Sequence, residues 1–306
     1  MNDGQQELSF SATFDRLNHN VFRFPAKFHP PVVRELIERF SCPGDTILDP
    51  FCGSGTTLIE ALVACRAAVG TDVDPLSVLI TRGKTQRYDM TRLDTLVTET
   101  AADLARLREA DRRLWGDFEA DIHPADYAAA RSGVATQIPA IPNITHWFRR
   151  RVIIQLAIIK SRIDRYVSVP EHLFFQLCFA SIIRNASNAD PVPVSGLEVT
   201  KHMQRRELKG RIIDPYALFT MVLKRSFEGT KQFHSARTLK MIARVARADA
   251  RFFKCAGYRA GRLRDYLAAL FECGELLSSS SVRDVLVGTD RHFGGTPSAY
   301  AALPGP

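Results

Sequence analysis

Residues 46–72 hold a strand, a glycine-rich turn, a helix and a second strand in immediate succession, and this order restricts the fold most. Thr46–Asp49 and Ala67–Asp72 are short segments dominated by apolar and β-branched residues, which is the pattern of strands. Between them, Thr56–Cys65 combines helical propensity with a broad apolar face. Strands joined through a helix normally pair in parallel with a right-handed crossover, so the sequence predicts an α/β fold.

The pattern changes after Pro75, where long helical segments replace short strands. Leu93–Trp115 and His146–Val167 are the longest of the expected helices, and the helical pattern extends to about residue 283. A further strand candidate at 284–287 indicates a return to the sheet, and a Gly- and Pro-rich tail without periodicity follows it. We therefore expect three regions: a first part of the α/β domain at 1–90, a mostly helical insertion at 91–280, and a third strand with a loose tail at 281–306.

The charge of the chain favours a polyanionic partner. Among the 306 residues, 41 Lys and Arg stand against 33 Asp and Glu, which gives a net charge of +8 and a pI near 9.3. The six cysteines form no C-x-x-C pair, which favours reduced thiols over disulfides or a metal site. We find neither an export signal nor an apolar run long enough to cross a membrane, so we expect a cytoplasmic protein.

The turn DPFCGSGTT at Asp49–Thr57 is the strongest candidate for a binding site. Its two glycines let a ligand approach the backbone and the amides at the start of the helix. Asp72 follows Gly53 by 72 − 53 = 19 residues, close to the spacing of about 20 at which an acid contacts ribose hydroxyls. Leu58 stands where a dinucleotide site has its third glycine, and no phosphate loop is present.

The acid that opens this turn narrows the choice of ligand. A carboxylate at Asp49 suits a cofactor with an ammonium group better than one with a pyrophosphate, because carboxylate and phosphate repel each other. S-adenosylmethionine has the required charges. The alternative is that the glycines only make a tight turn and that Asp72 only ends a strand.

These residues resemble the S-adenosylmethionine-dependent DNA amino-methyltransferases, which methylate N4 of cytosine or N6 of adenine. FPAKFHP at Phe24–Pro30 is similar to motif X of that family, and Asp49–Thr57 is a close match to its motif I. The resemblance implies a Rossmann-like methyltransferase sheet with a large helical insertion. It places the methionine part of the cofactor at Phe24–Phe28 and Asp49–Thr56, the ribose at Asp72 and the adenine amino group at Asp290. The implied cofactor-binding residues are Phe24, Pro25, Lys27, Phe28, Asp49, Pro50, Phe51, Cys52, Gly53, Ser54, Gly55, Thr56, Asp72 and Asp290.

The positive charge is concentrated in the second half of the helical insertion. Residues 201–255 contain 14 Lys or Arg and 4 Asp or Glu, a difference of +10. Six aromatic residues are interleaved with these charges, a mixture suited to phosphates and to unstacked bases. We therefore expect double-stranded DNA to bind this region, which becomes the candidate target-recognition region. A second basic cluster, Arg149–Arg151, fits a solvated helix turn at least as well.

The sequence lacks the motif that the amino-methylating family uses for catalysis. The family polarises the amino group with [DNS]-P-P-[YFW] after the fourth strand, and neither His29–Val32 nor Asp190–Pro193 fits that pattern. No cysteine follows a proline, which also excludes the nucleophile that the C5-methylating family uses. Without a fourth strand, Thr46–Asp49 would become an open edge of the sheet. We accordingly assign no catalytic residue and no metal ligand.

Three functions follow from these observations. The first is a DNA amino-methyltransferase that is truncated before its catalytic motif, by a frameshift near Asp290, and inactive alone. The second is a non-catalytic DNA-binding or specificity subunit that needs a partner chain and whose glycine loop is only architectural. The third is an RNA or small-molecule methyltransferase, which motifs X and I favour least.

Overall fold

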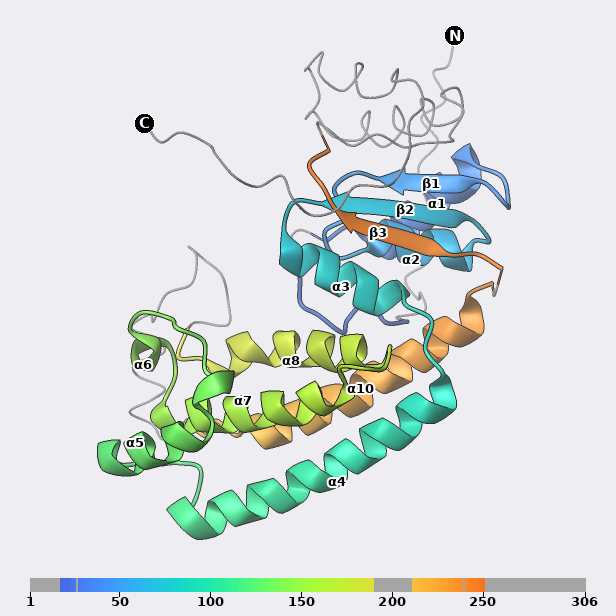
Figure 1. The fold of residues 1–306 in the computed structure, drawn as a ribbon. Helices are drawn as coiled ribbons and strands as arrows, with labels where there is room; N and C mark the ends of the chain where they lie inside the picture. Colours follow the sequence, from blue (N-terminus) through green and yellow to red (C-terminus); the bar gives the residue numbers. More distant parts are fainter. Residues whose placement is uncertain (1–16, 26, 190–210, 239, 251–306) are drawn as a thin grey trace, which may run out of the picture.

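The computed structural model describes residues 17–25, 27–189, 211–238 and 240–250. They form a small parallel sheet flanked by helices and, next to it, a layer of long helices (Figure 1). None of the helices in these residues is long and apolar enough to cross a membrane. The α/β fold with a large helical part agrees with the sequence prediction.

In the part of the chain that the structure describes, the sheet has three parallel strands in the order β1, β2, β3. These are β1 Thr46–Asp49, β2 Ala67–Asp72 and β3 Ala243–Arg247. Thr46 pairs with Ala67, and Ala68 pairs with Ala243. Within the described residues β1 therefore has a single neighbouring strand, and it lies at the edge where the sequence places it.

The third strand differs from the sequence prediction. β3 lies inside the region 91–280 that the sequence assigns to the helical insertion, whereas the expected strand at 284–287 is outside the described residues. The sequence ARVAR is short and rich in arginine, and its charge conceals the alternation of a strand. Ala243 and Val245 pack against the apolar cluster beneath β1 and β2, while Arg244 is exposed. From Ala243 to Val245 the side chains thus alternate between the apolar cluster and solvent, whereas Ala246 is half-buried and Arg247 is exposed.

Helices cover both faces of the sheet. α1 Pro30–Phe40 and α2 Thr56–Val63 pack together on one face, and α3 Pro75–Thr85 lies on the other (Figure 1). Ile37 and Leu58 are fully buried between α1, α2 and the strands. α3 begins sharply because the Asp74 carboxylate accepts hydrogen bonds from the amides of Leu76 and Ser77.

The second layer is built from four long helices that share one apolar core. α4, α7, α8 and α10 pack around the rings of Phe174, Phe175 and Phe219, which are completely buried. The described elements of this layer are α4 Met90–Trp115, α5 Pro124–Gly133, the 3-10 helix η1 Ala135–Gln137, α6 Ile144–Trp147, α7 Arg150–Ile163, the 3-10 helix η2 Asp164–Tyr166, α8 His172–Ala186 and α10 Pro215–Ala236. The expected helix at 146–167 is split, because the chain is extended at Phe148 and Arg149.

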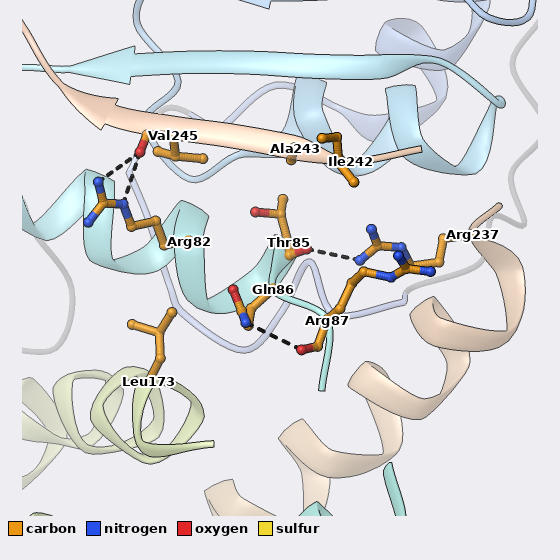
Figure 2. Close-up of a pocket in the computed structure, with 9 residues that line it drawn as sticks. All are labelled: Arg82, Thr85, Gln86, Arg87, Leu173, Arg237, Ile242, Ala243 and Val245. Atoms are coloured by element: carbon orange, nitrogen blue, oxygen red, sulfur yellow. Dashed lines mark hydrogen bonds between the residues drawn. The ribbon is translucent and has the colours of Figure 1, made fainter. Parts of the chain in front are cut away.

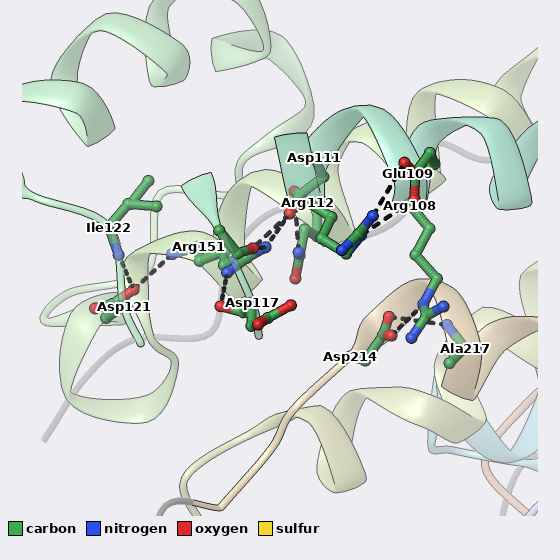
Figure 3. A network of polar contacts seen from close by, with 12 residues as sticks. Arg108, Glu109, Asp111, Arg112, Asp117, Asp121, Ile122, Arg151, Asp214 and Ala217 are labelled. Atoms are coloured by element: carbon green, nitrogen blue, oxygen red, sulfur yellow. Dashed lines mark hydrogen bonds and ion pairs between the residues drawn. The ribbon is translucent and has the colours of Figure 1, made fainter. Parts of the chain in front are cut away.

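A buried ion pair fixes the end of α4 against the start of α7 (Figure 3). The Arg151 guanidinium donates through Nε to Asp111 at 2.9 Å and through Nη1 to the Asp117 carbonyl at 2.6 Å. It also lies 4.2 Å from the centre of the Phe118 ring. Arg151 is thus a structural residue and not part of a solvated basic turn, which the sequence had fitted at least as well for 149–151.

Candidate binding site at the glycine-rich loop

The loop between β1 and α2 depends on two glycines. Gly53 and Gly55 have φ angles of 46° and 77°, in the left-handed region that other residues avoid. A Cβ at Gly55 would lie 2.9 Å from two side-chain atoms of Thr81, whose hydroxyl donates to the Gly53 carbonyl at 3.0 Å. The loop is therefore held against α3 with no room for a larger residue at Gly55.

Asp72 joins this loop to the end of β2. Its Oδ2 accepts a hydrogen bond from the Gly53 amide at 2.9 Å, and its Oδ1 accepts one from the Asp74 amide at 3.0 Å. The two residues that the sequence paired by a spacing of 19 are thus in direct contact. Each carboxylate oxygen has a second lone pair, so both can accept a further hydrogen bond from a ligand.

A second carboxylate lies beside the first. Asp49 ends β1, and its Oδ1 accepts from the Phe51 amide at 3.1 Å. Burial raises the pKa of Asp49 above its ordinary value, and the nearby charge of Asp72 adds to this rise, while hydrogen bonds from Thr57 and Phe51 oppose it. The carboxyl ends of β1 and β2 therefore form an acidic site, which favours a cationic group and disfavours phosphates.

One aromatic ring packs on the glycine loop, and two others nearby in the sequence are exposed. The Phe24 ring is 3.3 Å from the point that a Cβ on Gly53 would occupy, so the motif X segment packs directly on the loop. Phe51, which follows β1, is 63% exposed, and Phe28 is 66% exposed. The Lys27 ammonium donates to the His19 carbonyl at 3.3 Å and to Asn20 Oδ1 at 3.2 Å.

Several of the remaining predicted site residues are buried in the loop or hydrogen-bonded to neighbouring segments. Ser54 and Thr56 are buried, with 3.3 Å between their hydroxyl oxygens. Cys52 is also buried, and desolvation raises the pKa of its thiol to about 12, so it is neutral and unreactive at ordinary pH. Pro25 is exposed, and Pro50 accepts at its carbonyl from the Thr71 hydroxyl at 3.0 Å. Asp290 lies outside the described residues.

Sequence reasoning missed a layer of buried polar residues beneath the loop. Lys84 is 1% exposed, and its ammonium donates to the Ser54 carbonyl at 3.0 Å and to the His19 carbonyl at 3.2 Å. Glu60 is equally buried and accepts from Arg34 at 2.7 Å, with His19 Nε2 also at 2.7 Å. The available signal was a charge within an otherwise largely apolar helix: Glu60 alone in LIEALV, and Lys84 next but one to Arg82 in LITRGKT.

The aromatic residues interleaved with the basic residues belong to the core wherever the structure describes them on α10. Tyr216, Phe219 and Phe233 are buried, and Phe227 packs against the same core. The exposed face of this helix still presents positive charges, at Lys224, Arg225 and Lys231. Base stacking on α10 is therefore excluded for the buried rings, whereas contact with phosphates is compatible with the geometry.

No group of side chains suited to holding a metal ion occurs among the described residues. The acidic pair at the loop does not amount to one, because Asp49 and Asp72 are two carboxylates and such a group needs at least three ligand side chains.

Comparison with known proteins places this site in a family. Residues 5–81, which include the Phe24 segment, the glycine loop and Asp72, match the model of a family described as DNA methylase. Over these residues the chain is similar to that family. No solved structure matches it significantly.

Two of the similar curated proteins are Type II methyltransferases. M.MvaI from Kocuria varians is 27% identical over 192 residues, which cover 61% of this chain and 38% of that protein. M.MjaII from Methanocaldococcus jannaschii is 30% identical over 119 residues, or 36% of this chain and 22% of that protein. A tRNA (guanine(10)-N2)-dimethyltransferase from Methanothermobacter thermautotrophicus is 37% identical over 90 residues, or 29% of this chain and 26% of that protein. The chain thus spans less than half the length of each of these relatives.

Proposed function

We propose that this chain carries the cofactor-binding part of an S-adenosylmethionine-dependent DNA methyltransferase whose target is N4 of cytosine or N6 of adenine. The observation that carries the proposal is the contact between Asp72 and the Gly53 amide, inside the segment that matches the DNA methylase family. Similarity to Type II methyltransferases favours DNA as the substrate.

The described residues fit the cofactor in charge and shape. Asp72 has acceptor capacity left for the two ribose hydroxyls, and the Asp49 carboxylate suits the methionine ammonium. Phe24 and the exposed rings of Phe28 and Phe51 supply apolar surface around the methionine part. When bound, S-adenosylmethionine supplies the methyl group from its sulfonium.

Methyl transfer also needs residues that act on the target base. A base in a duplex has to leave the stack before its amino group can reach the cofactor, and acceptors must then polarise that amino group. No [DNS]-P-P-[YFW] sequence occurs in residues 1–306. We therefore propose that these acceptors lie outside the 306 residues, on a continuation of the polypeptide or on a partner chain. The exposed cations of α10 would contact the DNA backbone.

Two binding experiments test this proposal. Titration calorimetry of the chain with S-adenosylmethionine should give one site, and the affinity for duplex DNA should fall linearly with the logarithm of salt concentration. DNA binding without cofactor binding would favour the non-catalytic DNA-binding subunit. Cofactor binding without affinity for duplex DNA would favour an RNA or small-molecule methyltransferase, an alternative that the similarity to a tRNA methyltransferase keeps open.

The position of methylation requires the complete enzyme. Plasmid DNA incubated with the chain, a complementing partner and labelled S-adenosylmethionine should yield N4-methylcytosine or N6-methyladenine on nucleoside mass spectrometry. The chain alone should transfer no label. Transfer by the chain alone would contradict the placement of the polarising acceptors outside these 306 residues.

A further inference from the structure

A pocket of about 300 Å³ lies on the α3 face of the sheet (Figure 2). It is enclosed by the second half of α3, the start of β3, the segment after α10 and one residue of α8. The residues that line it are Arg82, Thr85, Gln86, Arg87, Leu173, Arg237, Ile242, Ala243 and Val245. The second half of α3 contacts the glycine loop through Thr81 and Lys84. The same part of the helix lines the pocket with Arg82 and Thr85.

The pocket is strongly positive. Three of its nine residues are arginines, and none of the described residues that line it is Asp or Glu. Arg82 donates through Nε and Nη2 to the Val245 carbonyl, at 3.0 and 2.8 Å. Among the described ion pairs, none involves Arg82 or Arg237. Neutral carbonyls orient these two guanidinium groups without neutralising them.

Arg237 is the buried member of this cluster. It is 4% exposed and donates to the carbonyls of Thr85 at 2.9 Å and Met241 at 3.1 Å. Its Nε is buried and has no partner in the described structure. Burial lowers the pKa of Arg237 to about 10, and the positive charge of Arg87 adds to that effect. A buried cation with an unused donor beside a second cation is an arrangement that an anion would stabilise.

We propose that this pocket binds a phosphate group. Guanidinium groups match tetrahedral oxyanions because their planar donors form paired hydrogen bonds, and arginine is accordingly the usual residue at phosphate sites. The volume is at the lower end of the range of about 300 to 1,000 Å³ for small-molecule pockets. The phosphate belongs either to the nucleic-acid backbone or to a free small molecule. The cofactor assigned to the acidic loop has no phosphate, so the two sites are chemically distinct.

Calorimetry with inorganic phosphate, at constant ionic strength set by chloride, tests the site on the full chain. Arg82 and Arg87 have exposed side chains, so Arg82→Gln and Arg87→Gln each remove a positive charge from the pocket. Arg82→Gln also removes the hydrogen bonds to the Val245 carbonyl. We expect each substitution to raise the dissociation constant for phosphate at least tenfold. Arg106→Gln is the matched control, because Arg106 is an exposed arginine of α4 remote from the pocket, and it should leave the constant unchanged.

The source of the phosphate follows from DNA binding by the same variants. If the site binds a phosphate of the nucleic-acid backbone, inorganic phosphate should compete with duplex DNA. Arg82→Gln should then lower the slope of DNA affinity against salt concentration, on logarithmic scales, by about one. If the site binds a free small molecule, inorganic phosphate should bind while the salt slope of DNA binding by Arg82→Gln stays that of wild type. Either result supports the site. The proposal is overturned by absence of phosphate binding above the chloride background, or by equal binding in wild type and both pocket variants. S-adenosylmethionine affinity, measured alongside, tests the proposed function independently.

Discussion

Lys84 should make the stability of this protein depend on pH in a way that one substitution abolishes. Its ammonium holds the glycine loop to the amino-terminal segment through the carbonyls of Ser54 and His19. Burial lowers the pKa of Lys84 to about 7, from an ordinary value of 10.5, and the charge of Lys27 contributes. Between these two values the unfolded chain binds more protons than the folded chain, so the free energy of unfolding rises with pH.

The size of the effect follows from the two pKa values. A full pH unit within the window is worth about 1.4 kcal/mol, and at pH 7 the folded-state lysine is only half protonated. From pH 7 to pH 8.5 the contribution of Lys84 therefore amounts to roughly 1.5 kcal/mol. Lys84→Met cannot titrate, so this part of the pH dependence should be absent from the variant.

Urea denaturation followed by circular dichroism at pH 7.0, 7.5, 8.0 and 8.5 measures this difference. The other titrating groups are common to both proteins. His19, whose lowered pKa depends in part on the charge of Lys84, titrates below this pH range, so Lys84 dominates the difference between the two curves. The advantage of wild type over Lys84→Met should grow by roughly 1.5 kcal/mol across the range. Parallel curves would refute the argument, because they would mean that Lys84 has the same pKa in the folded and unfolded chains.

Two further substitutions test the loop and the helical core by denaturation. Gly55→Ala should lower the free energy of unfolding by about 1–3 kcal/mol, because φ is 77° and the added methyl would lie 2.9 Å from Thr81 atoms. Gly133→Ala is the control and should be tolerated, because nothing lies within contact distance of its added methyl. Equal stabilities of the two variants would contradict this explanation of the loop. Arg151→Met should cost about 3–5 kcal/mol because it leaves the Asp111 carboxylate buried without its partner, and the added substitution Asp111→Leu should recover part of that loss. A double variant less stable than Arg151→Met would show that an unpaired charge is not the cause.

The glycine loop could be predicted from sequence because its signals are local. Two glycines at a strand-to-helix turn specify the backbone, and the spacing to Asp72 specifies which carboxylate meets the Gly53 amide. The strands β1 and β2 and the helix between them follow from the same short segment. Long helices such as α4 were equally predictable. A helical periodicity that extends over 26 residues identifies the helix even where its first and last residues are predicted wrongly.

The parts that were not predicted depend on contacts between distant residues. β3 is separated from β2 by 170 residues of sequence, and nothing within ARVAR indicates which strand it will join. Lys84 and Arg151 are charges that become buried only because carbonyls or a carboxylate from remote segments meet them. The sequence shows such residues as ordinary surface charges, since the partners that compensate for burial are found only in the folded chain.

The most direct test of the cofactor site is calorimetric titration of S-adenosylmethionine into wild type, Asp72→Asn and Asp74→Asn. Asp72→Asn removes the charge and one acceptor that face the proposed ribose, while Asp74→Asn removes a neighbouring charge but preserves a residue suited to capping α3. The account predicts binding to wild type and Asp74→Asn, with affinity for Asp72→Asn reduced at least tenfold. Equal affinity in all three proteins, or none in wild type, would contradict it.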